Sequence, residues 1–142
     1  MLSVTNALVI DASVAVKWVL DEKGSAAAFA LRTENLTAPA LWLVEAASAL
    51  WSTAARRQIS HSEAEVRLAA LRAAPMETTP VENDLANALQ LANKICHPIY
   101  DCFYLAAALR IDSYVVTADR RFVQACGKDR DLSRRVKLLD GL

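Results

Sequence analysis

The sequence contains little glycine, proline or cysteine, and it has no excess of charge of either sign. Only 3 of its 142 residues are glycine and 4 are proline, which argues against a fibrous or loop-rich fold. Its 16 basic and 16 acidic side chains cancel. Binding of nucleic acid through bulk positive charge is therefore excluded, whereas binding through a local basic patch is not.

The sequence also lacks features of membrane and secreted proteins. No apolar run reaches the roughly 18 residues that a membrane span needs, and residues 1–6 lack the basic segment of a secretory signal. The three cysteines, Cys96, Cys102 and Cys126, are odd in number and form no CxxC motif. We therefore expect a cytoplasmic protein with reduced thiols and no membrane association.

The remaining composition is typical of one globular domain spanning residues 1–142. It is 54% hydrophobic and 23% charged, with 27 alanines that favour helix. Short apolar runs predict strands at residues 7–10, 36–38, 76–79, 113–117 and 136–139. Helices are predicted at residues 13–20, 25–33, 41–57, 62–74, 83–95 and 98–110. This alternation predicts an α/β fold with a central, mainly parallel sheet.

Four carboxylates lie within or beside segments that otherwise resemble core. Asp11 and Asp119 follow predicted strands, while Glu45 and Asp101 lie in predicted helices that carry no other charge nearby. Ligands of such sheets bind at the carboxyl ends of the strands. A buried carboxylate needs a partner, and four together would repel one another.

A divalent cation would relieve that repulsion. All-oxygen ligation favours Mg²⁺ or Mn²⁺, and the two separated histidines, His61 and His97, offer little for zinc. A carboxylate-bound Mg²⁺ is suited to phosphodiester hydrolysis. Ser13 and Thr117 lie two residues from Asp11 and Asp119, so we expect their hydroxyls to orient a water or a carboxylate.

The helix predicted at residues 41–57 carries a narrow polar stripe. Glu45, Ser48 and Ser52 share one side of it. Trp42 and Trp51 lie nine residues apart, hence on opposite faces, so one is expected in the core and the other at an interface.

Four segments together resemble the acidic motifs of PIN-domain nucleases, in the order and spacing of VapC-type toxins of toxin–antitoxin pairs. They are VIDASVAVKW at residues 9–18, LVEAASAL at 43–50, HPIYDCFYLA at 97–106 and VTADRRF at 116–122. The resemblance extends over residues 8–139.

This resemblance implies an α/β/α sandwich and a Mg²⁺- or Mn²⁺-dependent endoribonuclease. It also implies a small cognate antitoxin and a homodimer. By position, Asp11 and Asp101 would be the principal metal ligands, and Glu45 and Asp119 would complete the catalytic set. Each of the four acids is present.

Local alternatives exist for individual residues. Asp11 and Asp119 can be helix caps, and Asp101 can complement a helix dipole, whereas Glu45 lies mid-helix and has no capping role. His97 is expected to begin a helix rather than to act in catalysis. The cysteines are expected in the core.

Basic residues near the fourth motif are candidates for RNA-backbone contacts. Residues 119–137 contain seven Lys or Arg and three Asp, a balance of +4, and Arg120 and Arg121 directly follow Asp119. Arg56 and Arg57 form a second candidate patch, although cations are also favoured at a helix C-terminus.

Three other functions fit parts of this pattern. One is a PIN-domain nuclease in RNA processing outside a toxin–antitoxin pair, and another is a non-catalytic PIN-like binding module. The third is a phosphohydrolase with an aspartyl nucleophile at Asp11, but Ser13 occupies the position where such enzymes usually carry a second aspartate.

Overall fold

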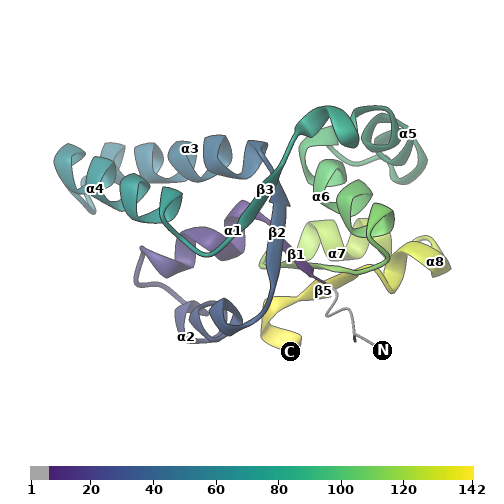
Figure 1. The fold of residues 1–142 in the computed structure, drawn as a ribbon, viewed down its shortest axis with the longest axis horizontal. Helices are drawn as coiled ribbons and strands as arrows, with labels where there is room; N and C mark the ends of the chain where they lie inside the picture. The colour runs from purple at the N-terminus through teal and green to yellow at the C-terminus, as the bar shows by residue number, and fades with distance from the viewer. Residues whose placement is uncertain (1–6) are drawn as a thin grey trace.

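The computed structural model describes residues 7–142 (Figure 1). The expectation of no secretory signal rests on residues 1–6, which lie outside the described residues. No helix within residues 7–142 is long and apolar enough to cross a membrane.

A five-stranded sheet forms the centre of the molecule. Its strands are β1 (Leu8–Ile10), β2 (Leu36–Pro39), β3 (Glu77–Thr79), β4 (Val115–Thr117) and β5 (Val136–Leu138). They lie in the order β3-β2-β1-β4-β5, and each neighbouring pair is parallel. The predicted parallel sheet is confirmed.

Helices cover both faces of this sheet (Figure 1). One layer contains α1 (Ala12–Ala15), α2 (Ser25–Ala30), α3 (Leu41–Ala55) and α4 (His61–Arg72). The other contains α5 (Leu85–Ile95), α6 (Ile99–Arg110), α7 (Arg120–Cys126) and α8 (Arg130–Ser133). Short 3₁₀ turns occupy Val16–Trp18, Leu31–Thr33, Val81–Asn83 and Leu139–Gly141. The molecule is a three-layer α/β/α sandwich, as predicted.

The two layers follow from the strand order. Successive strands move outward from β1 to β2 and β3, and the chain then crosses back to β4 and β5. Because parallel crossovers are right-handed, this reversal places the later helices on the opposite face of the sheet. The reversal lies between β1 and β4, and a crevice between the carboxyl ends of two such strands is where open α/β sheets bind ligands.

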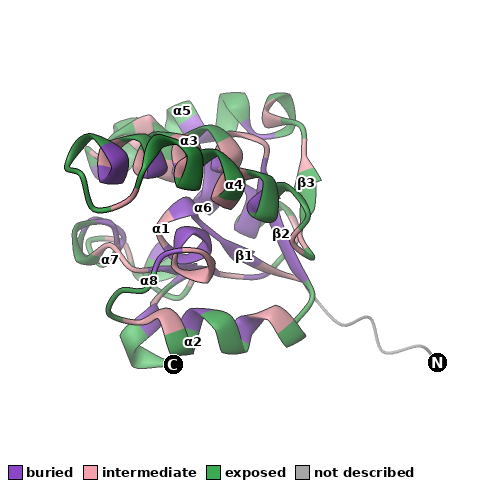
Figure 2. Ribbon diagram, turned by 90° about the vertical axis from the view of Figure 1, so that its left-hand side faces the viewer, coloured by how far each residue is buried: buried purple, intermediate pink, exposed green. Residues whose placement is uncertain are grey.

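The central strands β1, β2 and β4 and helix α6 form the most deeply buried part of the molecule (Figure 2). Every residue of β2 and β4 is buried, and α6 is buried continuously from Cys102 to Ala108. Helix α6 contacts β1, β2 and β4. A charged residue on the first turn of α6 is therefore held rigidly against the centre of the sheet.

Two parts of the chain differ from the predicted elements. Helix α4 begins at His61 because Ser60 caps it, with reciprocal hydrogen bonds between Ser60 and Glu63 that form a capping box. Helices α7 and α8 were not predicted at all. Their segment is rich in charge, and only the spacing of Phe122, Ala125 and Cys126, all buried, indicates a helix with one apolar face.

Candidate functional site

Asp11 lies at the carboxyl end of β1, next to β4. Its side chain is only 3% exposed. Oδ1 accepts hydrogen bonds from the Ser13 hydroxyl at 2.5 Å and from the Val14 backbone N–H at 3.2 Å. Oδ2 accepts one from the Thr117 hydroxyl. Asp11 thus caps α1, but the cap uses one oxygen, and the other faces the neighbouring strand.

Burial controls the ionisation of Asp11. The pKa of Asp11 is raised to about 7, mainly because burial removes its hydration; the hydrogen bonds from Ser13 and Thr117 lower the pKa, and the charge of Asp101 raises it. These partners are neutral hydroxyls. The carboxylate is therefore held in place without being neutralised.

Asp101 lies in the first turn of α6, where a negative charge complements the helix dipole. Its Oδ2 is 2.6 Å from Nε2 of His97, one helical turn earlier. The His97 ring stacks on Phe122 with a centroid separation of 5.4 Å. Burial raises the pKa of Asp101, the His97 contact lowers it, and the charge of Asp119 raises it.

Glu45 projects from the middle of α3. Its Oε1 accepts a hydrogen bond from the hydroxyl of Tyr104, a buried residue of α6. Burial raises the pKa of Glu45, the hydrogen bond from Tyr104 lowers it, and the charge of Asp101 raises it. Burial of Tyr104 itself and the charge of Glu45 raise the pKa of Tyr104, so its phenol stays protonated and remains a donor.

Asp119 follows β4 and caps α7. Its Oδ1 accepts a hydrogen bond from the Arg121 backbone N–H at 2.9 Å. Its own N–H donates to the Thr117 hydroxyl at 3.1 Å, and the neighbouring Ala118 N–H donates to the Ser13 hydroxyl at 3.0 Å. Ser13 and Thr117 therefore connect the turn after β1 to the turn after β4.

The structure brings the four predicted acids together at one end of the sheet. The charge of Asp101 acts on both Asp11 and Glu45, and the charge of Asp119 acts on Asp101. None of the four forms an ion pair with lysine or arginine within residues 7–142. We refer to Asp11, Glu45, Asp101 and Asp119 as the acidic cluster.

The donor set of the acidic cluster fits a hard cation. Among the described residues, no three histidine, cysteine, aspartate or glutamate side chains form a ready-made metal-binding group. Mg²⁺ does not require one, since it usually retains several waters and binds to one or two carboxylates together with substrate phosphates. Asp11 and Asp101, the two carboxylates at the centre of the cluster, can supply such a pair.

A cysteine nucleophile is not available beside the cluster. Burial and the charge of Asp101 raise the pKa of Cys102 to about 11. The residue therefore remains a neutral thiol near pH 7, and the thiol is a far weaker nucleophile than the thiolate. Cys102 and Cys126 are buried, as expected, whereas Cys96 is exposed.

The two arginines predicted to contact RNA differ in their surroundings. Arg120 forms an exposed ion pair with Asp140 at 3.2 Å, whereas the guanidinium of Arg121 has no partner within the part of the chain that the structure describes. Because an exposed ion pair contributes little stability, Arg120 can exchange Asp140 for a phosphate.

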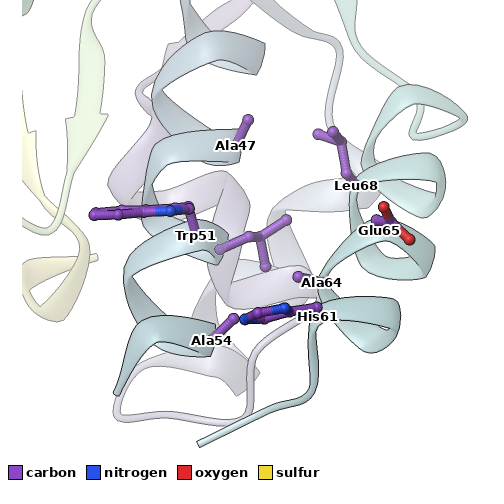
Figure 3. Close-up of a pocket in the computed structure, with 8 residues that line it drawn as sticks. Ala47, Trp51, Ala54, His61, Ala64, Glu65 and Leu68 are labelled. Atoms are coloured by element: carbon purple, nitrogen blue, oxygen red, sulfur yellow. The ribbon is translucent and has the colours of Figure 1, made fainter. Parts of the chain in front are cut away.

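Two hollows flank α3. The first, about 350 Å³ in volume, includes Ser13, Ala118 and Asp119 in its lining and thus borders the acidic cluster. The second lies between α3 and α4 (Figure 3) and is lined mainly by apolar residues, including Leu50 and Trp51, with none of the four acids. The second hollow is therefore separate from the acidic cluster.

The two tryptophans of α3 occupy different environments. Trp42 is 2% exposed and donates its indole N–H to the Thr78 hydroxyl at 3.1 Å, whereas Trp51 is 72% exposed. The prediction that one of them packs in the core is confirmed. Trp51 lies beside the apolar hollow (Figure 3).

Sequence reasoning missed two side chains that contact the cluster. His97 contacts Asp101, and the four-residue spacing of the two side chains in the sequence could have indicated this contact. Tyr104 contacts Glu45 across 59 positions, and no local pattern could have revealed that pairing.

Known proteins resemble this chain in sequence and in fold. Residues 8–128 match the PIN domain family. "Ribonuclease VapC12" of Mycobacterium tuberculosis, from strain H37Rv and from strain CDC 1551, is 31% identical over 126 residues, covering 88% of this chain and 96% of the relative.

The crystal structure of PAE2754 from Pyrobaculum aerophilum superposes with a TM-score of 0.68 at 18% identity, covering 96% of this chain and 91% of that one. At 18% sequence identity the superposition shows that the two proteins share a fold. The family match contains all four acidic motifs, and the chain therefore belongs to the PIN domain family, among its VapC-type members.

Proposed function

We propose that this protein is a Mg²⁺- or Mn²⁺-dependent endoribonuclease that acts as the toxin of a toxin–antitoxin pair. One observation carries the proposal. The acidic cluster lies where the strand order reverses; the charge of Asp101 raises the pKa of Asp11 and of Glu45, and no lysine or arginine within residues 7–142 forms an ion pair with any member. A divalent cation is the partner that this arrangement lacks.

Asp11 and Asp101 are the proposed metal ligands, and Glu45 and Asp119 complete the catalytic set. When bound, Mg²⁺ or Mn²⁺ lowers the pKa of a coordinated water and neutralises charge on phosphate oxygens. The protein would hold its carboxylates in fixed positions around the cation. In this proposal Glu45, half-buried on α3, accepts a proton from an attacking water, while Tyr104 donates a hydrogen bond to its Oε1.

Hydroxyl groups fix the geometry around Asp11. Ser13 and Thr117 donate to its two oxygens and also accept the Ala118 and Asp119 N–H groups. They thereby keep the β1 and β4 turns in register, and we propose that they position Asp11 rather than react.

RNA is the proposed substrate because the mycobacterial relatives are named ribonucleases. Arg121, with its free guanidinium, and Arg120 are the proposed phosphate contacts beside Asp119. Such contacts would be sensitive to salt.

The resemblance to VapC-type toxins supports a small antitoxin protein as partner, a homodimer and a cytoplasmic location. We propose further that residues 1–142 act as one nuclease domain, which the single hydrophobic core cluster supports.

RNA cleavage tests the proposed function. The protein is incubated with a pool of tRNA and rRNA in Mg²⁺ or Mn²⁺, with parallel reactions in EDTA. Asp101→Asn is the inactive variant, and Asp131→Asn, an exposed acid outside the cluster, is the matched control. The proposal expects discrete fragments from the wild type and from Asp131→Asn only. Fragments that persist in EDTA and with Asp101→Asn would refute it.

A further inference from the structure

The hollow beside the acidic cluster has a second wall that the proposed catalysis does not use. Ser13, Ala118 and Asp119 form the wall on the side of the cluster, and Ser52 and Arg56, at the C-terminal end of α3, line the hollow as well. Both walls therefore border one space of about 350 Å³.

One face of α3 connects this wall to the cluster. Glu45, Ser52 and Arg56 are spaced by seven and four residues, which places their side chains on one stripe of the helix. At 1.5 Å per residue, the stripe extends over about 16 Å. A chain-like ligand that contacts Glu45 can therefore continue along α3 to Arg56.

Of the two cations in the lining, Arg56 is the one that the hollow leaves available. Lys17, also in the lining, is held by Glu22 at 3.1 Å and by the Lys23 carbonyl at 2.7 Å. The guanidinium of Arg56 has neither a hydrogen-bond nor an ion-pair partner within residues 7–142. The Ser52 hydroxyl likewise makes no hydrogen bond to any described residue.

The rest of the lining is mixed: Glu22 is paired with Lys17 at 3.1 Å, Thr53 donates its hydroxyl to the Ala49 carbonyl at 2.8 Å, and the other residues are aliphatic. Val16, Leu20 and Ala49 contribute aliphatic surface to the hollow. Once the paired groups are set aside, the hollow offers one unpaired cation and one free hydroxyl beside aliphatic side chains, opposite Asp119. A nucleotide can meet this combination with its phosphate and the apolar faces of its base and ribose.

The helix dipole alone does not explain this arrangement. Both Arg56 and Arg57 lie at the C-terminus of α3, where a cation is favoured. Arg57, however, lines a different hollow, on the side of residues 58–63. The helix dipole favours an arginine at either position. It does not explain why Arg56 lines the hollow that borders the acidic cluster and has no partner within residues 7–142.

We propose that this hollow is a binding subsite for the nucleotide that flanks the scissile phosphate of a single-stranded RNA. Arg56 contacts the phosphate of that nucleotide, Ser52 donates a hydrogen bond to it, and the aliphatic surface packs against the base or ribose. The inference rests on the proposed function and assigns part of its substrate site.

The neighbouring arginines provide a matched test. Arg56→Gln and Arg57→Gln each remove one charge from the same helix end while retaining a long polar side chain. Each is combined with Asp101→Asn to prevent cleavage. Binding of a short, fluorescein-labelled single-stranded RNA of mixed sequence is then measured by anisotropy between about 50 and 200 mM salt.

Arg56→Gln is expected to weaken RNA binding about tenfold and to lower the slope of log K against log salt by about 0.7, the value for one phosphate contact on a single strand. Arg57→Gln is expected to change neither. Equal behaviour of the two variants, or an unchanged salt slope in Arg56→Gln, would overturn the subsite.

Cleavage assays with Asp101 intact separate this inference from the proposed function. A rise in KM for Arg56→Gln with nearly unchanged kcat supports the subsite, since it indicates lost binding rather than lost chemistry. Cleavage by Arg56→Gln with unchanged KM would overturn the subsite and leave the nuclease standing. Arg56-dependent RNA binding without cleavage by the wild type would overturn the nuclease and leave an RNA-binding site.

Discussion

The hydroxyl of Tyr104 on α6 donates a hydrogen bond to Glu45 on α3, so helices on opposite faces of the sheet meet at one carboxylate. Tyr104 is buried, and the charge of Glu45 and burial both raise its pKa. The phenol therefore stays protonated near neutral pH and donates to Glu45. This contact defines which way Glu45 points.

Tyr104→Phe is expected to lower kcat at least tenfold with little change in KM. The ring packing is retained, while Glu45 loses its donor, which costs about 1–2 kcal/mol of stability. Cleavage of the RNA pool and urea unfolding measure the two effects. Tyr100→Phe, at an exposed position of the same helix, is the control, and equal activity of the two variants would exclude a positioning role for Tyr104.

The stability of the metal-free protein is expected to depend on pH through Asp11. Its pKa is about 7 in the folded chain and near the ordinary 3.8 in the unfolded chain. Between these values the folded state binds a proton that the unfolded state has lost, so the free energy of unfolding falls as pH rises from about 4 to 7.

Asp11→Asn removes this dependence. In EDTA the variant is expected to match the wild type near pH 4 and to be more stable by about 4 kcal/mol near pH 8, because it buries no charge. Urea unfolding across this range measures the difference. A difference that does not change with pH would show that Asp11 stays ionised throughout.

His97 is expected to orient Asp101 for metal binding. His97→Phe keeps an aromatic ring against Phe122 but removes the 2.6 Å contact with Asp101. Loss of such an orienting partner lowers metal affinity about 10- to 100-fold, which a Mn²⁺ titration measures. His61→Phe, at the exposed start of α4, should bind Mn²⁺ like the wild type. Wild-type affinity of His97→Phe would contradict the role.

A structural ion pair lies far from this chemistry. Arg110 contacts both oxygens of the buried Asp84, at 2.8 and 3.1 Å. Arg110→Ala leaves that carboxylate buried and unpaired, so a loss of about 3 kcal/mol of unfolding free energy is expected. Arg72→Ala, which removes an exposed arginine from the last turn of α4, should change stability by less than about 0.5 kcal/mol. Similar losses of unfolding free energy in Arg110→Ala and Arg72→Ala would show that the Arg110–Asp84 ion pair does not stabilise the fold.

The fold was predictable because its signals are local. The run before Asp11 and the run before Asp119 are short, apolar and separated by helical segments, which dictates a parallel sheet. The strand order then places both aspartates at the β1–β4 reversal. The α7 helix escaped prediction because its cations dominate the segment and conceal the buried spacing of Phe122 and Cys126.

The acids of the site were visible as charges in apolar surroundings, but their partners were not. Asp11 and Thr117 are 106 residues apart in the sequence, and Glu45 and Tyr104 are 59 apart. The first contact depends on the pairing of β1 with β4, and the second depends on the packing that brings α6 near α3. Only the structure reveals that Lys17 is held by other residues whereas the guanidinium of Arg56 has no partner within residues 7–142.

Mn²⁺ binding followed by electron paramagnetic resonance tests the central claim most directly, because it requires no knowledge of the RNA target. The account predicts saturable binding to the wild type that strengthens as pH rises toward about 7, since the ion must displace the proton of Asp11. Binding should be lost in Asp11→Asn and in Asp101→Asn but retained in Asp131→Asn. Equal binding by all four proteins, or none by the wild type at millimolar Mn²⁺, would contradict a metal site at the acidic cluster.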